Sequence, residues 1–517
     1  MSEAIMNLVN FVRGCEPRRP KDLYTPVEQE IAINREKGLK STFLLQYDAL
    51  IRPDLQELFR RQSGPDTELG LWFEMNRPLT EAVGIEWRGR PGFDWDWYVN
   101  PGFLPAYTPA QREILIDEAF RKFHEIFGYY PRVAGSWILD AHSMAYMSDR
   151  YDMDAFCICR EQYAVDAYTL WGGYYSGGYY PSRKNMLCPA QTKTMQINTP
   201  VFRMLGIDPI YGYDEDKHSP RLGGCYTMEP YWPCGKDRDV MEWYFRAYCT
   251  NPAVTLSYAT TGQENSFGWE KVEAGYRLQA ELMQQYIQAG KLRVETLGET
   301  GTAFRKRFEQ TPPSALSALE DWSGHDLQSV WFSCGQYRAN LFRNGERLYF
   351  RDMQYFDENL TEPYFATPCT EWQAAYHNLP LVDNRLWSEP GQEAALSFAE
   401  PVQKIESLRE ENQTALMVLV RFTDGHLGTV RFAENGICFS GCGPLQWSFG
   451  NSKALSAAEP HRLVFRAYDT EYAVTTTGTV RHDSGTVLIT PADEELVLSF
   501  GTEENLKGNR HERNAET

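Results

Sequence analysis

Apolar residues recur along the first three hundred positions in two alternating patterns. Short, nearly continuous apolar runs predict buried strands at 41–50, 68–75, 133–140, 154–161, 251–263 and 291–299. Longer stretches with helical spacing predict helices, and the two strongest span 108–128 and 269–290. Continuous apolar strands that alternate with helices indicate a parallel sheet covered on both faces. The length of residues 41–311 favours a closed or nearly closed (β/α) barrel over an open sheet.

The helical spacing largely disappears after residue 311, and strand-like alternation replaces it. Turn signals at Asn344-Gly345 and Asp424-Gly425 separate strand-like runs and predict antiparallel hairpins. We therefore expect a linker at 312–328 and an antiparallel β-sandwich domain at 329–502. Residues 1–40 are polar with an amphipathic start, which predicts an N-terminal arm, and residues 503–517 are expected to form a disordered tail.

Charge and composition exclude several classes of protein. The chain has 517 residues and a formal net charge of −19, which argues against binding to nucleic acid or to anionic lipid. No apolar run approaches the roughly 18–20 residues of a membrane-spanning helix. The eleven cysteines form no Cys-x-x-Cys pair, and the N-terminus lacks the apolar core of a signal peptide. These features predict a reduced, cytoplasmic protein without membrane or nucleic-acid partners.

Acidic residues follow the predicted strands repeatedly. They are Asp48, Glu74, Asp140, Glu161 and Glu264. Catalytic side chains of parallel barrels stand at the carboxyl ends of strands, where a partly buried carboxylate needs a partner or a function. Each acid taken alone could instead form an ion pair with an arginine such as Arg77, Arg88 or Arg160. As a set, these acids are better explained as a site.

Aromatic residues make up 14% of the chain, and two aromatic-rich stretches lie among the predicted loops. Residues 86–103 place tryptophans among Asp94 and Asp96, and residues 169–185 combine tyrosines with paired glycines. Aromatic faces stack on sugar rings while acids hydrogen-bond to hydroxyl groups, so this mixture favours a carbohydrate site. The alternative is a pair of rigid loops whose aromatic side chains fill the core.

Motifs of other enzyme classes are missing from the sequence. There is no dinucleotide-binding or phosphate-binding glycine motif, no nucleophile elbow and no His-Glu-x-x-His zinc motif. His142 and His218 are the histidines nearest the candidate loops. We interpret both as hydrogen-bonding residues of a pocket rather than as metal ligands.

The stretch Gly135-Ser136-Trp137-Ile138-Leu139-Asp140-Ala141-His142-Ser143 resembles the nucleophile strand of class II α-mannosidases. The family-57 glycosidases are similar, with a catalytic glutamate at the same strand end. Both belong to the glycoside hydrolase and polysaccharide deacetylase superfamily, whose members are (β/α)7 barrels often followed by β-rich domains. The chain also resembles uncharacterised gut-bacterial proteins of that superfamily. The resemblance implies a (β/α)7-type barrel with Asp140 as the nucleophile and Glu264 as the acid on a late strand.

The sequence departs from the metal-dependent branches of this superfamily. Gln46-Tyr47-Asp48 stands where the mannosidases carry His-x-Asp, and the paired aspartates and His-x-x-x-His of the deacetylases are missing. The resemblance therefore implies a member that needs no metal or other cofactor.

The combined prediction is a glycoside hydrolase that cleaves an oligosaccharide with retention. Asp140 would attack the anomeric carbon, and Glu264 would protonate the leaving oxygen and later activate water. The expected substrate-binding residues are Asp48, Glu74, Trp72, Trp95, Asp96, Trp97, Trp137, His142, Arg160 and Trp269. The alternatives are a non-catalytic carbohydrate-binding protein on a hydrolase barrel, and a metal-dependent mannosidase or deacetylase using Asp48, Asp140 and His142. The sequence leaves an oligomer possible.

Overall fold

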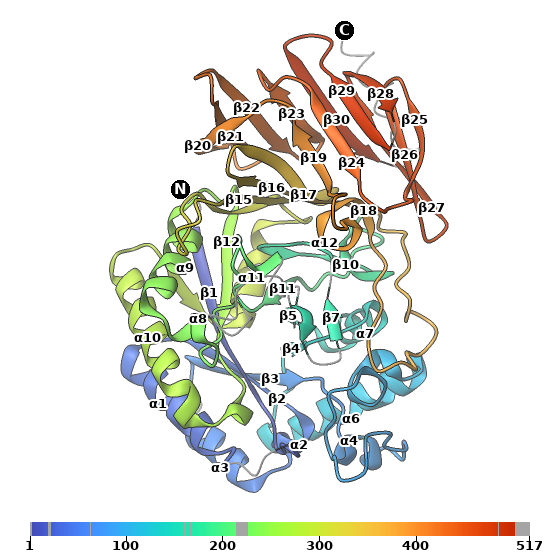
Figure 1. The fold of residues 1–517 in the computed structure, drawn as a ribbon. Coiled ribbons are helices and arrows are strands. Elements are labelled where there is room, and N and C mark those ends of the chain that lie inside the picture. Colours follow the sequence, from blue (N-terminus) through green and yellow to red (C-terminus); the bar gives the residue numbers. More distant parts are fainter. Residues whose placement is uncertain are drawn as a thin grey trace.

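A computed structural model places a parallel-rich barrel below an antiparallel β-sandwich (Figure 1). It describes residues 3–18, 22–62, 64–159, 162–165, 168–170, 172–213, 226–483 and 485–501. The expected tail at 503–517, and also Arg160, Glu161 and His218, lie outside the described residues.

The barrel is a sheet of parallel strands whose carboxyl ends share one edge. The parallel order is β12-β1-β2-β3-β4-β5-β11, and β13 also pairs parallel with β1 while β8 pairs antiparallel with β11. The backbone N–H of Gly206, just after β11, donates to the carbonyl of Thr260 on β12 over 2.9 Å, which nearly closes the ring. The strands are β1 (Glu3–Val12), β2 (Ser41–Leu45), β3 (Thr67–Trp72), β4 (Val133–Ser136), β5 (Ala155–Cys159), β8 (Gly178–Tyr179), β11 (Val201–Met204), β12 (Leu256–Thr261) and β13 (Arg293–Glu295).

Helices connect successive strands and cover the outside of the barrel. Helix α6 begins at a capping box in which Thr108 and Gln111 bond to each other's backbone N–H, and it ends at Gly128 in the left-handed conformation. No helix of the described chain is long and apolar enough to cross a membrane. The helices are α1 (Thr25–Lys37), α2 (Tyr47–Leu50), α3 (Pro53–Gln62), α4 (Arg77–Ala82), α5 (Val99–Gly102), α6 (Pro109–Phe127), α7 (Ala141–Tyr151), α8 (Pro233–Lys236), α9 (Arg238–Thr250), α10 (Trp269–Gln288) and α11 (Leu297–Arg307).

Two antiparallel sheets enclose a separate hydrophobic core above the barrel. The hairpins expected at Asn344-Gly345 and Asp424-Gly425 are confirmed as β16–β17 and β21–β22. The first sheet contains β14 (Ser314–Ala318), β15 (Gln328–Ser333), β16 (Tyr337–Asn344), β17 (Arg347–Tyr355), β18 (Leu379–Asp383), β19 (Ala394–Phe398), β24 (Leu445–Phe449), β28 (Thr479–Asp483) and β29 (Thr486–Thr490). The second contains β20 (Val402–Glu411), β21 (Ala415–Phe422), β22 (Leu427–Ala433), β23 (Gly436–Ser440), β25 (Leu455–Glu459), β26 (Arg462–Ala467), β27 (Thr470–Thr476) and β30 (Glu495–Gly501).

Three sequence-based boundaries are corrected. Residues 1–40 are not an arm, because β1 lies inside the sheet between β12 and β2 and α1 follows it. The apolar run of β1 is interrupted by Asn7 and Asn10, which are fully buried and donate hydrogen bonds to Thr300 of α11 and Tyr276 of α10, respectively. The expected linker at 312–328 contains β14, a strand of the first sandwich sheet. The strand expected at 291–299 is only β13, because α11 begins at Leu297 with Thr296 as its cap.

The sandwich contacts the barrel at the amino end of β12 and also after β11, where Arg351 donates to the carbonyls of Pro209 and Ile210. One long segment of the sandwich also runs back along the barrel. At the amino end, Ala315 N–H donates to the carbonyl of Ala253 over 3.0 Å. Residues 356–378, which we call the return segment, leave β17 and run down the barrel towards α6 and α7 (orange in Figure 1). Cys369 N–H of this segment donates to Pro105 O over 2.9 Å, so the segment reaches the loops that follow β3.

Close packing inside the barrel generates a test of the fold. A Cβ atom at Gly135 of β4 would lie 2.4 Å from Cys157 Sγ and 2.9 Å from Leu44 Cδ1, both on other strands. We expect Gly135→Ala to lower the free energy of unfolding by about 1–3 kcal/mol in chemical denaturation, because the overpacked strands must shift. Gly64→Ala is the control, since its Cβ would meet nothing within 4 Å. Equal stability of the two variants would contradict this packing.

Candidate active site

Four polar side chains lie one to three residues after parallel strands and meet at the carboxyl edge of the barrel. Arg13 follows β1, Gln46 follows β2, Glu74 lies two residues after β3, and Glu264 follows β12. All four are buried, with Arg13 3% exposed. Because parallel strands present their carboxyl ends at one edge, residues far apart in the chain converge there.

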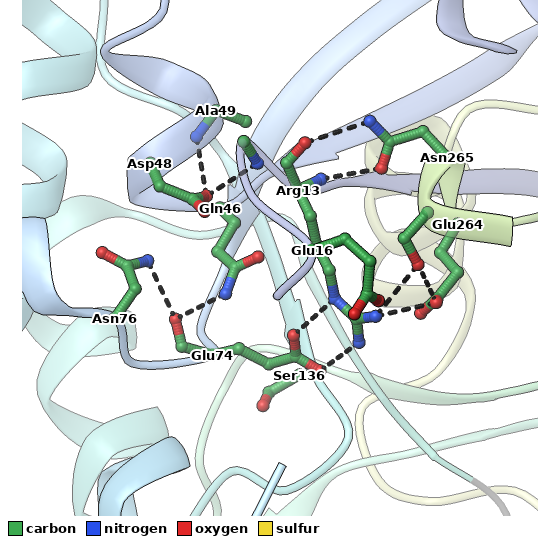
Figure 2. Close-up of polar contacts among 12 residues, drawn as sticks. Arg13, Glu16, Gln46, Asp48, Ala49, Glu74, Asn76, Ser136, Glu264 and Asn265 are labelled. Atoms are coloured by element: carbon green, nitrogen blue, oxygen red, sulfur yellow. Dashed lines mark hydrogen bonds and ion pairs between the residues drawn. The ribbon is translucent and has the colours of Figure 1, made fainter. Parts of the chain in front are cut away.

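Arg13 binds two carboxylates at once. Its Nε and Nη2 donate to Glu74 over 2.9 and 3.0 Å, and its Nη1 donates to Glu264 over 2.7 Å. Figure 2 shows the guanidinium group between the two acids, beneath the loop that carries Glu16. One buried guanidinium therefore holds two glutamates close together. We call Arg13, Glu74 and Glu264 the Arg13 cluster.

The electrostatics of the Arg13 cluster act on the protonation of Glu264. Burial raises the pKa of Glu264, the positive charge of Arg13 opposes that rise, and the negative charge of Glu74 adds to it. The Ser266 hydroxyl donates to Glu264 and stabilises the charged form. A carboxyl group with a raised pKa is suited to deliver a proton at a pH where an exposed glutamate is fully ionised.

Backbone hydrogen bonds fix the position of Arg13. The Asn265 side chain, at the start of a short 3-10 helix (Asn265–Phe267), accepts from Arg13 N–H over 2.9 Å and donates to Arg13 O over 3.0 Å. The next residue, Gly14, donates its N–H to Asp48 over 2.9 Å, and Asp48 also accepts from Ala49 N–H. Asp48 is thus a buried anchor for the loop after β1, and burial raises its pKa.

Buried polar atoms without a protein partner lie around the cluster. Within the described residues, Gln46 Oε1, Trp72 Nε1 and Trp95 Nε1 are buried and have no hydrogen-bond partner. Leaving such atoms unsatisfied costs on the order of 1–3 kcal/mol each. A polar ligand or water molecules at this edge would satisfy them.

The predicted tryptophans divide into two groups. Trp72 stacks on Phe11 with ring centroids 4.5 Å apart, and Trp137 meets both rings edge-on at 5.0 and 5.6 Å, so these two lie in the core beneath the site. Trp95 lies under Arg13, whose guanidinium carbon is 4.0 Å from the ring centroid. Trp97 lies 6.0 Å from Trp95 and is only partly buried. Trp95 and Trp97 therefore belong to the surroundings of the cluster.

Asp140 has a different set of partners from Glu264. It caps α7 by accepting from Ser143 N–H over 2.9 Å, and it pairs with the fully buried Arg112 over 2.9 Å. Glu362 of the return segment accepts from Ala141 N–H over 2.8 Å and from Met186 N–H over 2.9 Å. The pKa of Glu362 is raised to about 8, chiefly by burial and secondly by the negative charge of Asp140. Within the described residues no hydrogen bond or ion pair joins Asp140 to Glu264, and each acid has its own arginine.

The remaining predicted residues have structural partners. Asp96 is fully buried and forms a two-pronged ion pair with Arg90. His142 is partly exposed and contacts Glu113 over 3.0 Å. Trp269 begins α10 and packs edge-on to Tyr276. None of these contacts involves a member of the Arg13 cluster.

Arg13, Arg112 and Glu362 are not among the site residues that the sequence predicts. Arg13 directly follows the apolar run of β1, and that position was the available signal, but interpreting 1–40 as an arm hid it. Arg112 lies within a helix and Glu362 within a long loop, so no local pattern marks either residue.

The residues required for a metal-dependent enzyme are not gathered. Asp48 accepts a hydrogen bond from the Gly14 backbone. Asp140 pairs with Arg112, and His142 contacts Glu113. Across the described part of the chain, no group of three or more histidine, cysteine, aspartate or glutamate side chains is arranged to hold a metal ion. These residues therefore do not fit the metal centre of the deacetylase and mannosidase branches.

Comparisons with known proteins bear on the fold of the chain. Residues 96–321 match a family model described as a domain of unknown function, DUF3863, for which a structure has been solved. No curated protein matches the chain.

Two solved structures are similar. The first, from Parabacteroides distasonis, is provisionally named a glycoside hydrolase/deacetylase. It is 16% identical with a TM-score of 0.52, and the match covers 74% of this chain and 90% of that one. The second, from Mycobacterium smegmatis, is provisionally named a polysaccharide deacetylase. It is 10% identical with a TM-score of 0.34, and the match covers 59% of this chain and 91% of that one. At this identity, the first likeness shows a shared fold.

Proposed function

We propose that this protein is a glycoside hydrolase in which Glu264 and Glu74 are the two catalytic carboxylates. The observation that carries the proposal is the Arg13 cluster itself: two buried glutamates on one guanidinium, at the carboxyl edge of a parallel barrel. Most glycoside hydrolases use two carboxylates that flank the glycosidic bond to be cleaved. The provisional name of the Parabacteroides distasonis protein supports the same class.

In the proposed mechanism, Glu264 is the acid and Glu74 the nucleophile. Protonated Glu264 gives its proton to the leaving oxygen while a Glu74 oxygen bonds to the anomeric carbon and the glycosidic bond breaks. Water then attacks the anomeric carbon, its proton passes to Glu264, and the Glu74–carbon bond breaks. Arg13 would orient Glu74 throughout with its two hydrogen bonds. Glu74 replaces Asp140 as nucleophile because Glu74 shares Arg13 with Glu264, whereas Asp140 pairs with Arg112.

A non-catalytic saccharide-binding protein is the second candidate. One observation favours it: both carboxylates of the Arg13 cluster are occupied by an arginine and buried. A deacetylase is a third candidate, because that activity is part of the provisional name of the Parabacteroides distasonis protein. Assays on acetylated glycans therefore belong beside the glycosidase assays.

The two-carboxylate proposal predicts the loss of turnover on removing either acid. We expect Glu264→Gln and Glu74→Gln each to lower kcat about 10²–10⁴-fold, because proton transfer or covalent attack is lost. The measurement is release of reducing sugar from a glycan panel by purified protein. Wild-type protein that binds saccharide but turns over neither glycosides nor acetylated glycans would instead favour the binding-protein candidate.

Ser266 offers a test through pH. Because its hydroxyl bonds to the charged form of Glu264, Ser266→Ala should raise the pKa of Glu264 further. Glu264 must be protonated to act as the acid, so the alkaline limb of the kcat/KM profile should move to higher pH. An alkaline limb that stays in place, or moves to lower pH, would remove Glu264 as the acid.

Asp140→Asn tests whether Asp140 is chiefly structural. Weakening its pair with the fully buried Arg112 should lower the free energy of unfolding by up to roughly 3–5 kcal/mol in chemical denaturation. Asp149→Asn, which breaks an exposed pair with Arg183, is the control and should cost about 1 kcal/mol or less. The folded Asp140→Asn protein should retain most of its turnover. A loss of turnover equal to that of Glu74→Gln would restore Asp140 as the nucleophile.

A further inference from the structure

We propose that a row of aromatic side chains leading from the Arg13 cluster to Trp372 binds a neutral oligosaccharide chain. The inference rests on the proposed function and specifies the class of substrate. This substrate is an uncharged glycan that extends beyond the two sugars joined by the cleaved bond. The aromatic row consists of Trp95, Trp97, Tyr98 and Trp372.

The aromatic row is continuous. Trp95 lies under Arg13, its ring is 6.0 Å from Trp97, and Trp97 is 5.8 Å from Tyr98. Tyr98 meets the Trp372 ring edge-on at 5.1 Å. No step between neighbouring rings exceeds 6.0 Å, so the row extends the site well beyond one sugar ring.

Exposure increases along the row. Trp95 is 1% exposed, Trp97 and Tyr98 are partly buried, and Trp372 is 59% exposed. Most of the Trp372 indole is therefore in contact with water rather than packed in the core. Such a gradient matches a glycan that is enclosed where its bond is cleaved and solvated further along its chain.

Trp372 is held in place although it is exposed. Its carbonyl accepts from Val99 N–H over 2.9 Å, and the nearby Thr370 carbonyl accepts from Asn100 Nδ2 over 3.2 Å. Together with the bond from Cys369 to Pro105, these contacts fasten the return segment to the loop after β3. A platform that is already fixed loses little conformational entropy when a ligand binds.

The charges beside the row favour a neutral sugar over an acidic one. Three arginines stack on its rings: Arg13, Arg18 and Arg90. Each of them is already paired with a carboxylate. Arg13 pairs with Glu74 and Glu264, Arg18 with Glu16, and Arg90 with Asp96. An acidic sugar would have to displace one of these acids, whereas a neutral sugar can contact the exposed Trp372 ring and the uncovered parts of Trp97 and Tyr98 without breaking an ion pair.

The experiment is affinity electrophoresis of the full-length protein in gels containing a soluble polysaccharide. The neutral probes are starch, xyloglucan and galactomannan, and the acidic probe is polygalacturonate. We expect at least one neutral polysaccharide to retard the protein, and Trp372→Ala to weaken that binding on the order of tenfold, as loss of an aromatic contact at a binding surface does. Tyr130→Ala is the matched control. Tyr130 is 48% exposed but precedes β4, at the opposite edge of the barrel.

The outcomes separate this inference from the proposed function. Retardation that depends on Trp372, in a protein without turnover, would support the aromatic row and remove the hydrolase proposal. Turnover that depends on Glu264, with neutral polysaccharide binding unchanged in Trp372→Ala, would overturn the row alone. The row would also be overturned by no retardation in any neutral polysaccharide, by stronger binding of polygalacturonate, or by an equal loss in Tyr130→Ala.

Discussion

The buried charge of Arg13 is the constraint on which the carboxyl edge of the barrel depends. Removing a guanidinium from water costs on the order of several kcal/mol, so it is stable there only with close, well-aligned partners. Glu74 and Glu264 supply them, and Asn265 holds the Arg13 backbone from both sides. The ends of β1, β3 and β12 are thereby tied to one another. The same neutralisation places two carboxylates side by side, which is the chemical feature from which the proposed function follows.

A second buried arginine organises the neighbouring part of that edge. Arg112 of α6 binds Asp140, which caps α7, and also donates to the carbonyl of Tyr364 in the return segment. Glu362 of the same segment accepts backbone N–H groups from Ala141 and Met186. The polar contacts around Arg112 therefore attach the sandwich to the barrel mouth. Asp140, which lies between β4 and α7 at the same edge, contributes to this attachment.

The sequence predicted what local patterns encode. Helix α6 has its capping residue and terminal glycine where expected, the two hairpins turn at their Asn-Gly and Asp-Gly pairs, and acids do follow the parallel strands. The pairings could not be predicted, because Arg13 and Glu264 are separated by 251 positions and nothing local links them. Strand β1 was missed because Asn7 and Asn10 interrupt its apolar run, and both find their partners hundreds of residues away.

The return segment connects the sandwich to the carboxyl edge of the barrel. The sandwich packs against the barrel at the amino end of β12, whereas the Arg13 cluster lies at the carboxyl end of the same strand. The return segment is a long loop that reaches that edge from the sandwich, where Cys369 N–H donates to Pro105 O. The loop carries Glu362 into the surroundings of Asp140 and Trp372 onto the loop after β3. The barrel mouth is therefore completed by residues from both parts, and neither part alone contains the proposed binding surface.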